Sequence, residues 1–498
     1  MNSLQSLTDK CVSLLKNPWW FCGIALTLLL GLTSRNLSPD LDLFHRLATG
    51  KLLLSSPSFP YKDPFSFSET LPIWIDHEWL SGVVFYKVYD AFGDPGLLGL
   101  RAALFACTIT LVVACNAHLT TLTPALLAWI VLCLLHGSFG WSSVIRCQAF
   151  TYLFIPLFLL GFIRAIQQQK WGILYATPIV MLLWCNLHGG FVLGLILLAL
   201  FVAHQILVRN RIILAVAIFA ASFAATAVNP YGFTAYWGYL IDALSMSRPD
   251  ILEWKPLLHQ SDQFIATLII SFPLTLGAAV MLLRKDASSP AGLPLQRTLL
   301  FFFLIIGFSG YSALRHSRFL VFYMVVIAAL GAPFLKMLAE TFSQQISQRG
   351  VRLSRVWGVS AHVLSSLVLY FLLLGIADRS LVTLRYDSFP VGAIDELEEA
   401  EESGRLLVDF NFGAYCLWRL YPRFLISMDS RYETAYTDAA VAKNHRALTT
   451  SGAKELQELA PTHILITVSN GKQPLAEFEE EWNEIYSNGS FRLFKKNP

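Results

Sequence analysis

The sequence predicts an α-helical membrane protein that crosses the bilayer about eleven times and ends in a small α/β domain. Hydrophobic residues make up 55% of the 498 residues and charged residues only 14%, whereas soluble proteins carry about 25% charged residues. Apolar stretches of the length that spans a bilayer recur up to residue 377. The small net charge of +3 gives no reason to expect a nucleic-acid partner.

Long apolar stretches define the candidate spans, and the first is expected to remain as an uncleaved signal anchor because it runs directly into polar sequence. The segment 80–92 is too short to cross the bilayer and predicts an amphipathic helix at the membrane surface. We therefore predict a transmembrane domain over 1–378, with its first outer loop at 35–95. The candidate spans are 18–34, 96–117, 122–138, 149–166, 171–187, 190–208, 212–229, 263–283, 298–313, 318–338 and 356–377.

The Lys and Arg residues of the short loops predict the orientation, because cytoplasmic loops are enriched in them. With these spans, five groups of basic residues fall on one side, which predicts a cytoplasmic N-terminus. The first outer loop and residues 379–498 then lie outside the cytoplasm. The groups are Lys10 and Lys16; Arg164 and Lys170; Arg209 and Arg211; Arg284, Lys285 and Arg297; and Lys336, Arg349, Arg352 and Arg355.

Residues 379–498 predict a soluble α/β domain, because short apolar strands alternate with helical patterns. Three of its polar residues, Asp409, Asp429 and Arg431, could line a sugar-binding surface or hold the domain together. Strands are expected at 405–410, 423–428, 462–467 and 491–494, and helices at 434–448, 452–460 and 474–484.

Carboxylates crowd the first outer loop beside the membrane, where ionisable groups are costly and often functional. Asp40 and Asp42 could supply a general base or hold a divalent metal through oxygen ligands. They could equally cap a helix at the membrane surface. Asp76, His77 and Glu78 could bind a sugar hydroxyl or a metal, or form a polar loop before the 80–92 helix.

Positive charge on the predicted outer face breaks the usual pattern of basic loops, and anion binding is one reason for it. Snorkelling to lipid phosphates is the alternative. His188 could donate to a substrate or pack within the fold, and Glu253 is a weaker candidate in a long outer loop. The outer basic residues are Arg146, Arg315, His316 and Arg318.

Several motifs in order resemble the multi-spanning GT-C glycosyltransferases that use polyprenyl-phosphate sugars, most of all bacterial members of unassigned specificity. The resemblance covers nearly the whole chain. The aromatic-aromatic-His that usually follows the first aspartate is Leu43-Phe44-His45 here, which displaces the His by one position. The motifs are DLFHRLATG (42–50), KDPFSFS (62–68), WIDHEWL (74–80), WCNLHGGF (184–191), RHSRF (315–319), FGAYCLWRLYP (412–422) and MDSRYE (428–433).

The resemblance implies an inverting hexosyl- or pentosyltransferase of the bacterial plasma membrane, with a polyprenyl-phosphate sugar as donor and a glycan, lipid or protein acceptor. Asp42, with Asp40 beside it, would deprotonate the acceptor hydroxyl. Arg315 and Arg318 would stabilise the charge on the departing phosphate. Some relatives use a divalent metal, so Mg²⁺ or Mn²⁺ at the two aspartates stays open. The remaining candidates are Arg146 and His316 for the phosphate, and Asp76, His77, Glu78, His188 and Glu253 for the substrate.

Three other functions compete with this interpretation. A lipid-linked glycan ligase or polymerase would place its key charges in a large late outer loop, whereas the late loop here is the short turn 314–318. A secondary transporter would show ionisable groups or helix breaks at mid-membrane depth in matching halves, and the sequence has no internal repeat. A non-catalytic membrane partner with the same fold is the third alternative.

Overall fold

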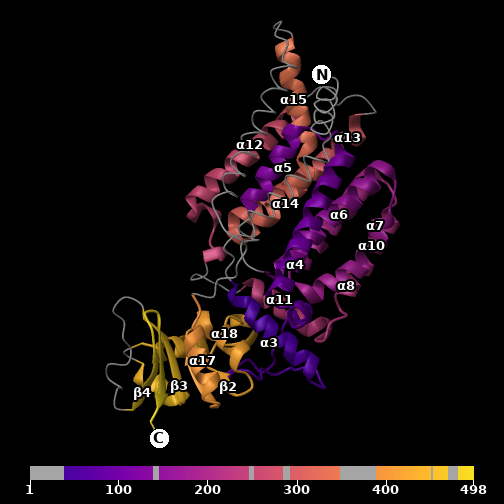
Figure 1. Cartoon of the computed structure of the whole chain (residues 1–498). Coiled ribbons are helices and arrows are strands. Elements are labelled where there is room, and N and C mark those ends of the chain that lie inside the picture. Colours follow the sequence, from indigo (N-terminus) through magenta and orange to yellow (C-terminus); the bar gives the residue numbers. More distant parts are fainter. Residues whose placement is uncertain are drawn as a thin grey trace, which may run out of the picture.

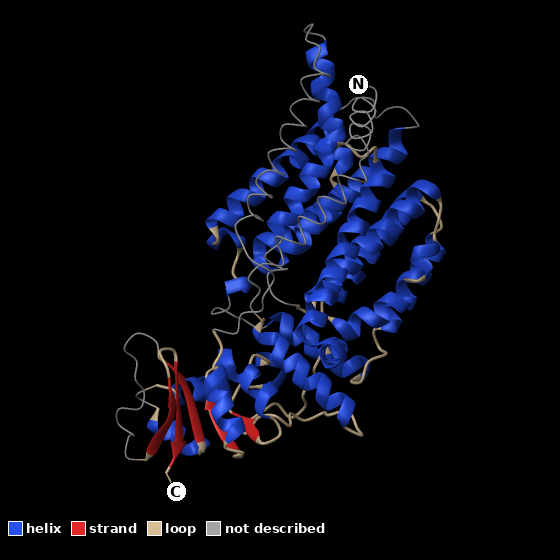
Figure 2. Ribbon diagram, viewed as in Figure 1, coloured by secondary structure: helices blue, strands red, loops and turns tan. Residues whose placement is uncertain are grey.

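The computed structural model describes residues 39–137, 145–245, 252–283, 292–347, 388–449, 452–468 and 481–497. The predicted spans 18–34 and 356–377 lie outside these residues. Within them the chain forms an elongated helical body, and a small sheet lies at one end of that body beside the C-terminus (Figure 1, Figure 2). Helix α3 (Leu41–Ser55) lies between the helical body and the sheet (Figure 1).

The helical body is mostly apolar and its helices pack side by side (Figure 2). After α3 its helices are α4 (Trp79–Leu119), α5 (Pro124–His136), α6 (Gln148–Gln168), α7 (Gly172–Tyr175), α8 (Thr177–Leu187), α9 (Phe191–Val208), α10 (Ile212–Ala225), α11 (Gly232–Ser245), α12 (Ser261–Leu283), α13 (Gly292–Arg315), α14 (Leu320–Leu330) and α15 (Ala332–Ser347). Short 3-10 turns η2 (Leu252–Trp254), η3 (Leu257–His259) and η5 (Ser317–Phe319) connect some of them.

Five helices of the described residues are long and apolar enough to cross a membrane, or six if the pair formed by α14 and α15, bent by 56°, is one span. The expectation of a mostly helical membrane protein is therefore confirmed, whereas the count of eleven spans stays a prediction. Three of the predicted spans, in α5, α8 and α10, form apolar helices of 11 to 14 residues. The helix predicted at 80–92 is present, and it continues through a kink at Gly93 (φ 62°) into the next predicted span.

The C-terminal residues form a mixed five-stranded sheet of order β2-β1-β3-β5-β4. Strand β1 pairs in parallel with β2 and β3, and β5 runs antiparallel to β3 and β4. Its strands are β1 (Gly404–Val408), β2 (Phe424–Ile426), β3 (His463–Thr467), β4 (Trp482–Ser487) and β5 (Phe491–Lys496). Its helices are α17 (Val391–Glu399), α18 (Phe410–Leu420), α19 (Tyr432–Ala435), α20 (Asp438–Ala447) and α21 (Ala453–Leu459).

One helix prediction in this region is wrong, because 482–484 belongs to β4 and not to a helix over 474–484. Strand β4 is the edge of the sheet, with only Trp482 buried. Its remaining positions are polar or partly exposed, so they carry no clear alternation of apolar and polar residues. The residues 474–480 of that predicted helix lie outside the described part of the chain.

The first outer loop and the C-terminal region share one apolar core. The rings of Phe44 in α3 and Tyr415 in α18 lie 5.0 Å apart, and Phe65 and Trp74 of the first loop are buried in the same core. Ser66 forms a parallel bridge with Ile426 of β2. Residues about 360 positions apart in sequence are therefore packed together, which fixes α3 from the side opposite the helical body.

Candidate functional site

Helix α3 begins at the predicted aspartates. Asp40 is its N-cap, and the Asp40 carboxylate accepts a hydrogen bond of 3.0 Å from the backbone N–H of Asp42. Asp42 lies in the first turn, where a negative charge is favoured by the helix dipole. The capping role considered for Asp40 is thus present, and it fixes the backbone that carries Asp42.

Two glycines bring α3 against α4. A Cβ atom on Gly50 would overlap the backbone carbonyl of Gly82, and a Cβ on Gly82 would lie 2.7 Å from the carbonyl oxygen of Arg46. A larger side chain at either position would therefore push the helices apart. This close contact sets Arg46, one helical turn after Asp42, beside the 76–78 segment at the start of α4.

Arg46 joins the acids of the WIDHEWL segment in a buried cluster. Its guanidinium forms an ion pair with Asp76 and lies 2.6 Å from the Glu78 carboxylate. Burial alone would raise the pKa of Glu78, but the charge of Arg46, together with His77 and its hydrogen bond, holds that pKa well below its usual range. Asp76 and Arg46 are only 3% and 6% exposed. We conclude that this pair supports the structure around Glu78.

His188 approaches the same carboxylate from the NLHGG turn, with Nε2 3.4 Å from Glu78 Oε1. The backbone N–H of Gly190 donates to His188 Nδ1 over 2.9 Å, so Nε2 carries the proton of the neutral ring. Burial lowers the pKa of His188 to about 4. His77 Nε2 lies 3.5 Å from the same Oε1 atom. The two imidazoles thus meet at one oxygen of a buried carboxylate.

A second, more open cluster surrounds Arg146. Its Nε lies 2.9 Å from Asp40 Oδ2, its Nη2 lies 3.7 Å from Asp42 Oδ2, and its Nη1 lies 3.6 Å from Glu253 Oε2. Arg318 Nη1 lies 4.0 Å from the other oxygen of Glu253. We call this set, Asp40, Asp42, Arg146, Glu253 and Arg318, the Arg146 cluster. The Asp42 side chain is 43% exposed, so it is accessible to a substrate.

Burial by surrounding protein and the neighbouring Asp40 raise the pKa of Asp42 to about 7, although Arg146 and Arg46 oppose the rise. Burial likewise raises the pKa of Asp40, against the charge of Arg146 and the hydrogen bond from Asp42. A carboxylate that titrates near neutrality can accept a proton efficiently at that pH. The partial exposure of Asp42 leaves room for a hydroxyl to reach it.

The two arginines predicted to bind phosphate have different surroundings at the turn after α13. Arg318 stacks on the ring of Trp254, with its guanidinium 4.3 Å from the ring centre. His316 donates from Nδ1 to the Trp254 carbonyl oxygen over 2.6 Å, which ties this turn to η2. Arg315 is exposed and forms no ion pair with a described residue. It therefore lies outside the Arg146 cluster.

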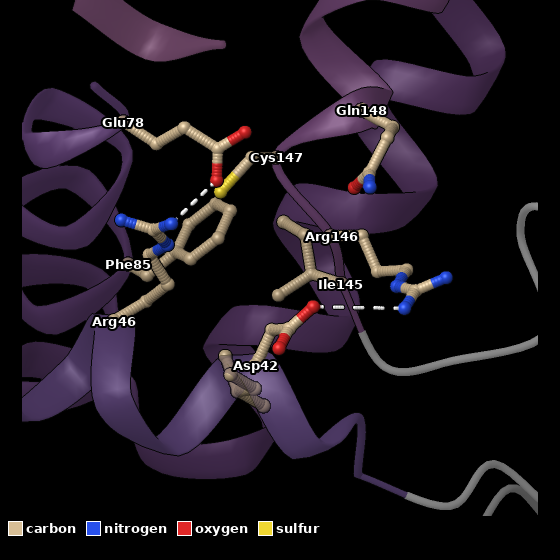
Figure 3. Close-up of a pocket in the computed structure, with 9 residues that line it drawn as sticks. Asp42, Arg46, Glu78, Phe85, Ile145, Arg146, Cys147 and Gln148 are labelled. Atoms are coloured by element: carbon tan, nitrogen blue, oxygen red, sulfur yellow. Dashed lines mark ion pairs between the residues drawn. The ribbon is translucent and has the colours of Figure 1, made fainter. Parts of the chain in front are cut away.

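A small cavity connects the two clusters (Figure 3). Asp42 and Arg146 point toward each other on one side of it, and Arg46 and Glu78 pair on the other (Figure 3). Its walls come from the starts of α3, α4 and α6, which are distant in sequence. The lining residues are Asp42, Leu43, Arg46, Glu78, Phe85, Ile145, Arg146, Cys147 and Gln148.

Three residues that line the cavity had no role predicted from the sequence: Arg46, Cys147 and Gln148. For Arg46 a signal existed, because residues four apart on a helix share a face, and Arg46 is four residues after Asp42. Cys147 and Gln148 follow Arg146 directly, and only the packing of α6 against α3 and α4 places them at the cavity. Sequence spacing carries no signal for such a contact.

The predicted metal ligands lie beside a positive charge. Asp40 and Asp42 both face the guanidinium of Arg146, and a divalent cation between them would have to displace that charge. Within the described parts of the chain, no three His, Cys, Asp or Glu side chains are grouped so as to hold a metal ion. The arrangement of these residues does not fit a divalent metal.

No protein-family model and no curated protein matches the chain. Among solved structures, it is similar to the crystal structure of the oligosaccharyltransferase of Archaeoglobus fulgidus in the apo form, with a TM-score of 0.60 and 11% identity over 94% of this chain and 73% of that one. A second structure is the archaeal oligosaccharyltransferase AglB of the same organism in complex with an inhibitory peptide and a dolichol-phosphate, with a TM-score of 0.48, 11% identity, and coverage of 90% and 69%. At this identity the first likeness concerns the fold alone.

Proposed function

We propose that this protein is a membrane glycosyltransferase that moves a sugar from a polyprenyl-phosphate donor to an acceptor hydroxyl, with inversion at the anomeric carbon. The observation that carries the proposal is the Arg146 cluster, in which an accessible carboxylate lies beside two guanidiniums at the end of a helical membrane body. The resemblance of its motifs to GT-C glycosyltransferases and the likeness of its fold to an oligosaccharyltransferase support it.

Asp42 is the general base in this proposal. Its carboxylate takes the proton of the acceptor hydroxyl, and the hydroxyl oxygen forms a bond to the anomeric carbon from the face opposite the phosphate. The bond between that carbon and the phosphate oxygen breaks, and the lipid phosphate leaves with the electron pair. A pKa raised to about 7 by burial and by Asp40 suits this role near neutral pH.

Arg318 and Arg315 would receive the phosphate, and His316 would hold their turn against η2. Guanidiniums suit phosphate because they present several donors in a planar fork. Arg318 is 25% exposed and stacked on Trp254, so its position is largely fixed before the donor binds. A preorganised cation stabilises charge that develops on the leaving group in the transition state. Arg146 lies within the same surface and could contribute to it.

The sugar would lie near Glu78, His77 and His188, whose polar atoms meet around one carboxylate. Asp76 would act through Arg46, because it is 3% exposed. Glu253 would orient Arg318. We further propose that the 379–498 domain lies outside the cytoplasm beside the acceptor path, that the N-terminus is cytoplasmic, and that the membrane is a bacterial plasma membrane.

The direct test is Asp42→Asn in the full-length protein, assayed for transfer from a polyprenyl-phosphate sugar in nanodiscs. We expect the rate to fall about 100-fold or more, because a general base contributes at least that factor. Asp90→Asn, at an exposed position of α4, is the matched control and should transfer at the normal rate. Unchanged transfer by Asp42→Asn would remove the base, and loss only in His316→Ala would favour the ligase or polymerase alternative.

A further inference from the structure

Three carboxylates from two distant segments meet one guanidinium. Asp40 and Asp42 come from the start of α3, and Glu253 comes from η2, more than 200 residues later. Arg146 uses a different nitrogen for each, with Nε toward Asp40, Nη2 toward Asp42 and Nη1 toward Glu253. The whole fork of the side chain is therefore directed at carboxylate oxygens.

This arrangement has the charge pattern of a cation site in which the cation is a side chain. Three carboxylates this close repel one another, and a positive charge between them offsets the repulsion. Guanidinium keeps its charge at any physiological pH and forms paired bonds with carboxylates. Arg146 is 29% exposed, so it is held by these acids on one side and open to solvent on another.

A second cation stands on the far side of Glu253, since Arg318 Nη1 lies 4.0 Å from Glu253 Oε1. Stacking on Trp254 keeps Arg318 there. A divalent ion entering the cluster would meet two guanidiniums at short range, and each would oppose it.

We propose that Arg146 is the resident cation of this site, whose charge balances Asp40, Asp42 and Glu253 and keeps them from gathering around a divalent metal. The inference rests on the proposed function, and it implies that the proposed sugar transfer needs no divalent metal. Arg146 is then a positioning residue, which fixes Asp42 and connects the first outer loop to the turn that carries Arg318.

The test measures Mn²⁺ binding to the full-length protein in detergent by electron paramagnetic resonance, with no need for transfer activity. We expect no stoichiometric Mn²⁺ binding by the unmodified protein. Arg146→Ala should gain a single Mn²⁺ site, and adding Asp40→Asn to that variant should abolish it. Arg315→Ala removes an exposed positive charge outside the cluster, so it should gain none.

Tight Mn²⁺ binding by the unmodified protein that is lost in Asp40→Asn would overturn the inference, and so would failure of folded Arg146→Ala to gain a site. If Arg146→Ala does not fold, the milder Arg146→Gln takes its place. The Mn²⁺ measurement on the unmodified protein still tests the inference. Transfer that survives a chelator supports the inference, and transfer that stops and is restored by Mn²⁺ contradicts it. Loss of the proposed function would leave the Mn²⁺ measurements unchanged, so the two failures are distinguishable.

Discussion

Two arginine–carboxylate clusters in this protein use the same chemistry in opposite surroundings. Arg431 of the C-terminal region pairs with Asp63 of the first loop over 2.6 Å and with Asp429 over 2.8 Å, and all three side chains are at most 2% exposed. Its guanidinium also lies 4.9 Å from the ring centre of Phe65 and 5.0 Å from that of Trp74. The Arg146 cluster has three acids on one guanidinium and side chains that are 14% to 43% exposed.

The difference in exposure separates a cluster that holds the fold together from one that a ligand can reach. Each donor direction and each face of Arg431 is occupied by protein, so nothing remains for a ligand to contact. The Arg431 cluster therefore joins the C-terminal region to the first loop. The Arg146 cluster keeps solvent contact, which leaves the Asp42 carboxylate able to exchange protons.

Breaking the Arg431 cluster, which is closed to solvent, should have the largest effect on stability. Arg431→Ala would leave the Asp63 and Asp429 carboxylates buried and unpaired, which costs about 3–5 kcal/mol. We expect a large drop in the melting temperature of the purified full chain, measured by fluorescence in detergent. Arg492→Ala, which breaks a surface pair with Glu484 on the sheet, should cost at most about 1 kcal/mol.

Equal melting temperatures of Arg431→Ala and Arg492→Ala would show that the Arg431 cluster does not join the C-terminal region to the first loop. Arg431→Lys is the informative intermediate, because an ammonium keeps the charge but lacks the planar fork that reaches both carboxylates. We expect it to melt between the other two variants.

The Arg146 cluster, which is open to solvent, should instead affect the pH dependence of the transfer rate. Asp42 accepts a proton only when ionised, so the rate should rise with pH and level off above about 7. Asp40 is the second cause of the raised pKa, after burial, so Asp40→Asn should move the rising limb to lower pH. The groups that face Asp42 in this balance are Asp40, Arg146, Arg46 and Glu78.

The sign for stability is opposite to the sign for activity. A folded-state pKa above the ordinary value means that folding favours the protonated carboxyl, so the stabilisation from Asp42 is lost as the pH rises through about 7. Activity should therefore increase over the same interval in which this contribution to stability declines. A flat rate profile between pH 5 and about pH 8, or an identical limb in Asp40→Asn, would contradict the assignment of Asp42 as the base.

The variant with the smallest expected effect tests whether the Arg431 cluster helps to position the Arg146 cluster. Ser430 lies beside Arg431, and its hydroxyl is 3.0 Å from Nδ1 of His45, which follows Asp42 by one helical turn. Ser430→Ala removes this hydrogen bond and should cost about 0.5–1.5 kcal/mol, with a modest loss of transfer rate at unchanged KM. The exposed Ser55→Ala at the end of α3 is the control. A normal rate in Ser430→Ala would mean that α4 alone positions α3.

Several parts of this fold follow from sequence patterns alone. The apolar stretches predicted a helical membrane body, and the alternating pattern of residues 379–498 predicted strands that overlap β1, β2, β3 and β5. The edge strand β4 was missed because its residues are mostly solvated and lack an apolar face. The displaced His45 gains an explanation from its contact with Ser430, a residue 385 positions away.

The candidate site shows the same division. Most of its charged residues could be named from sequence, because titratable groups beside apolar spans are costly and therefore informative. Their partners could not, since Arg46 with Glu78, or Arg146 with Glu253, meet only after α3, α4, α6 and η2 have packed. Sequence distance carries no information about which charges pair across such a distance.

The sequence by itself determined that this chain lies in a membrane, where its charges gather, and which of them are unusual, because composition and the bilayer's width act on each segment separately. The tertiary structure decided that Asp42 is accessible while Asp76 is buried, and that Arg146 rather than a neighbouring cation lies between the acids. Those outcomes depend on close approach, such as that of Gly50 and Gly82, and pair interactions between charges vary steeply with distance and burial.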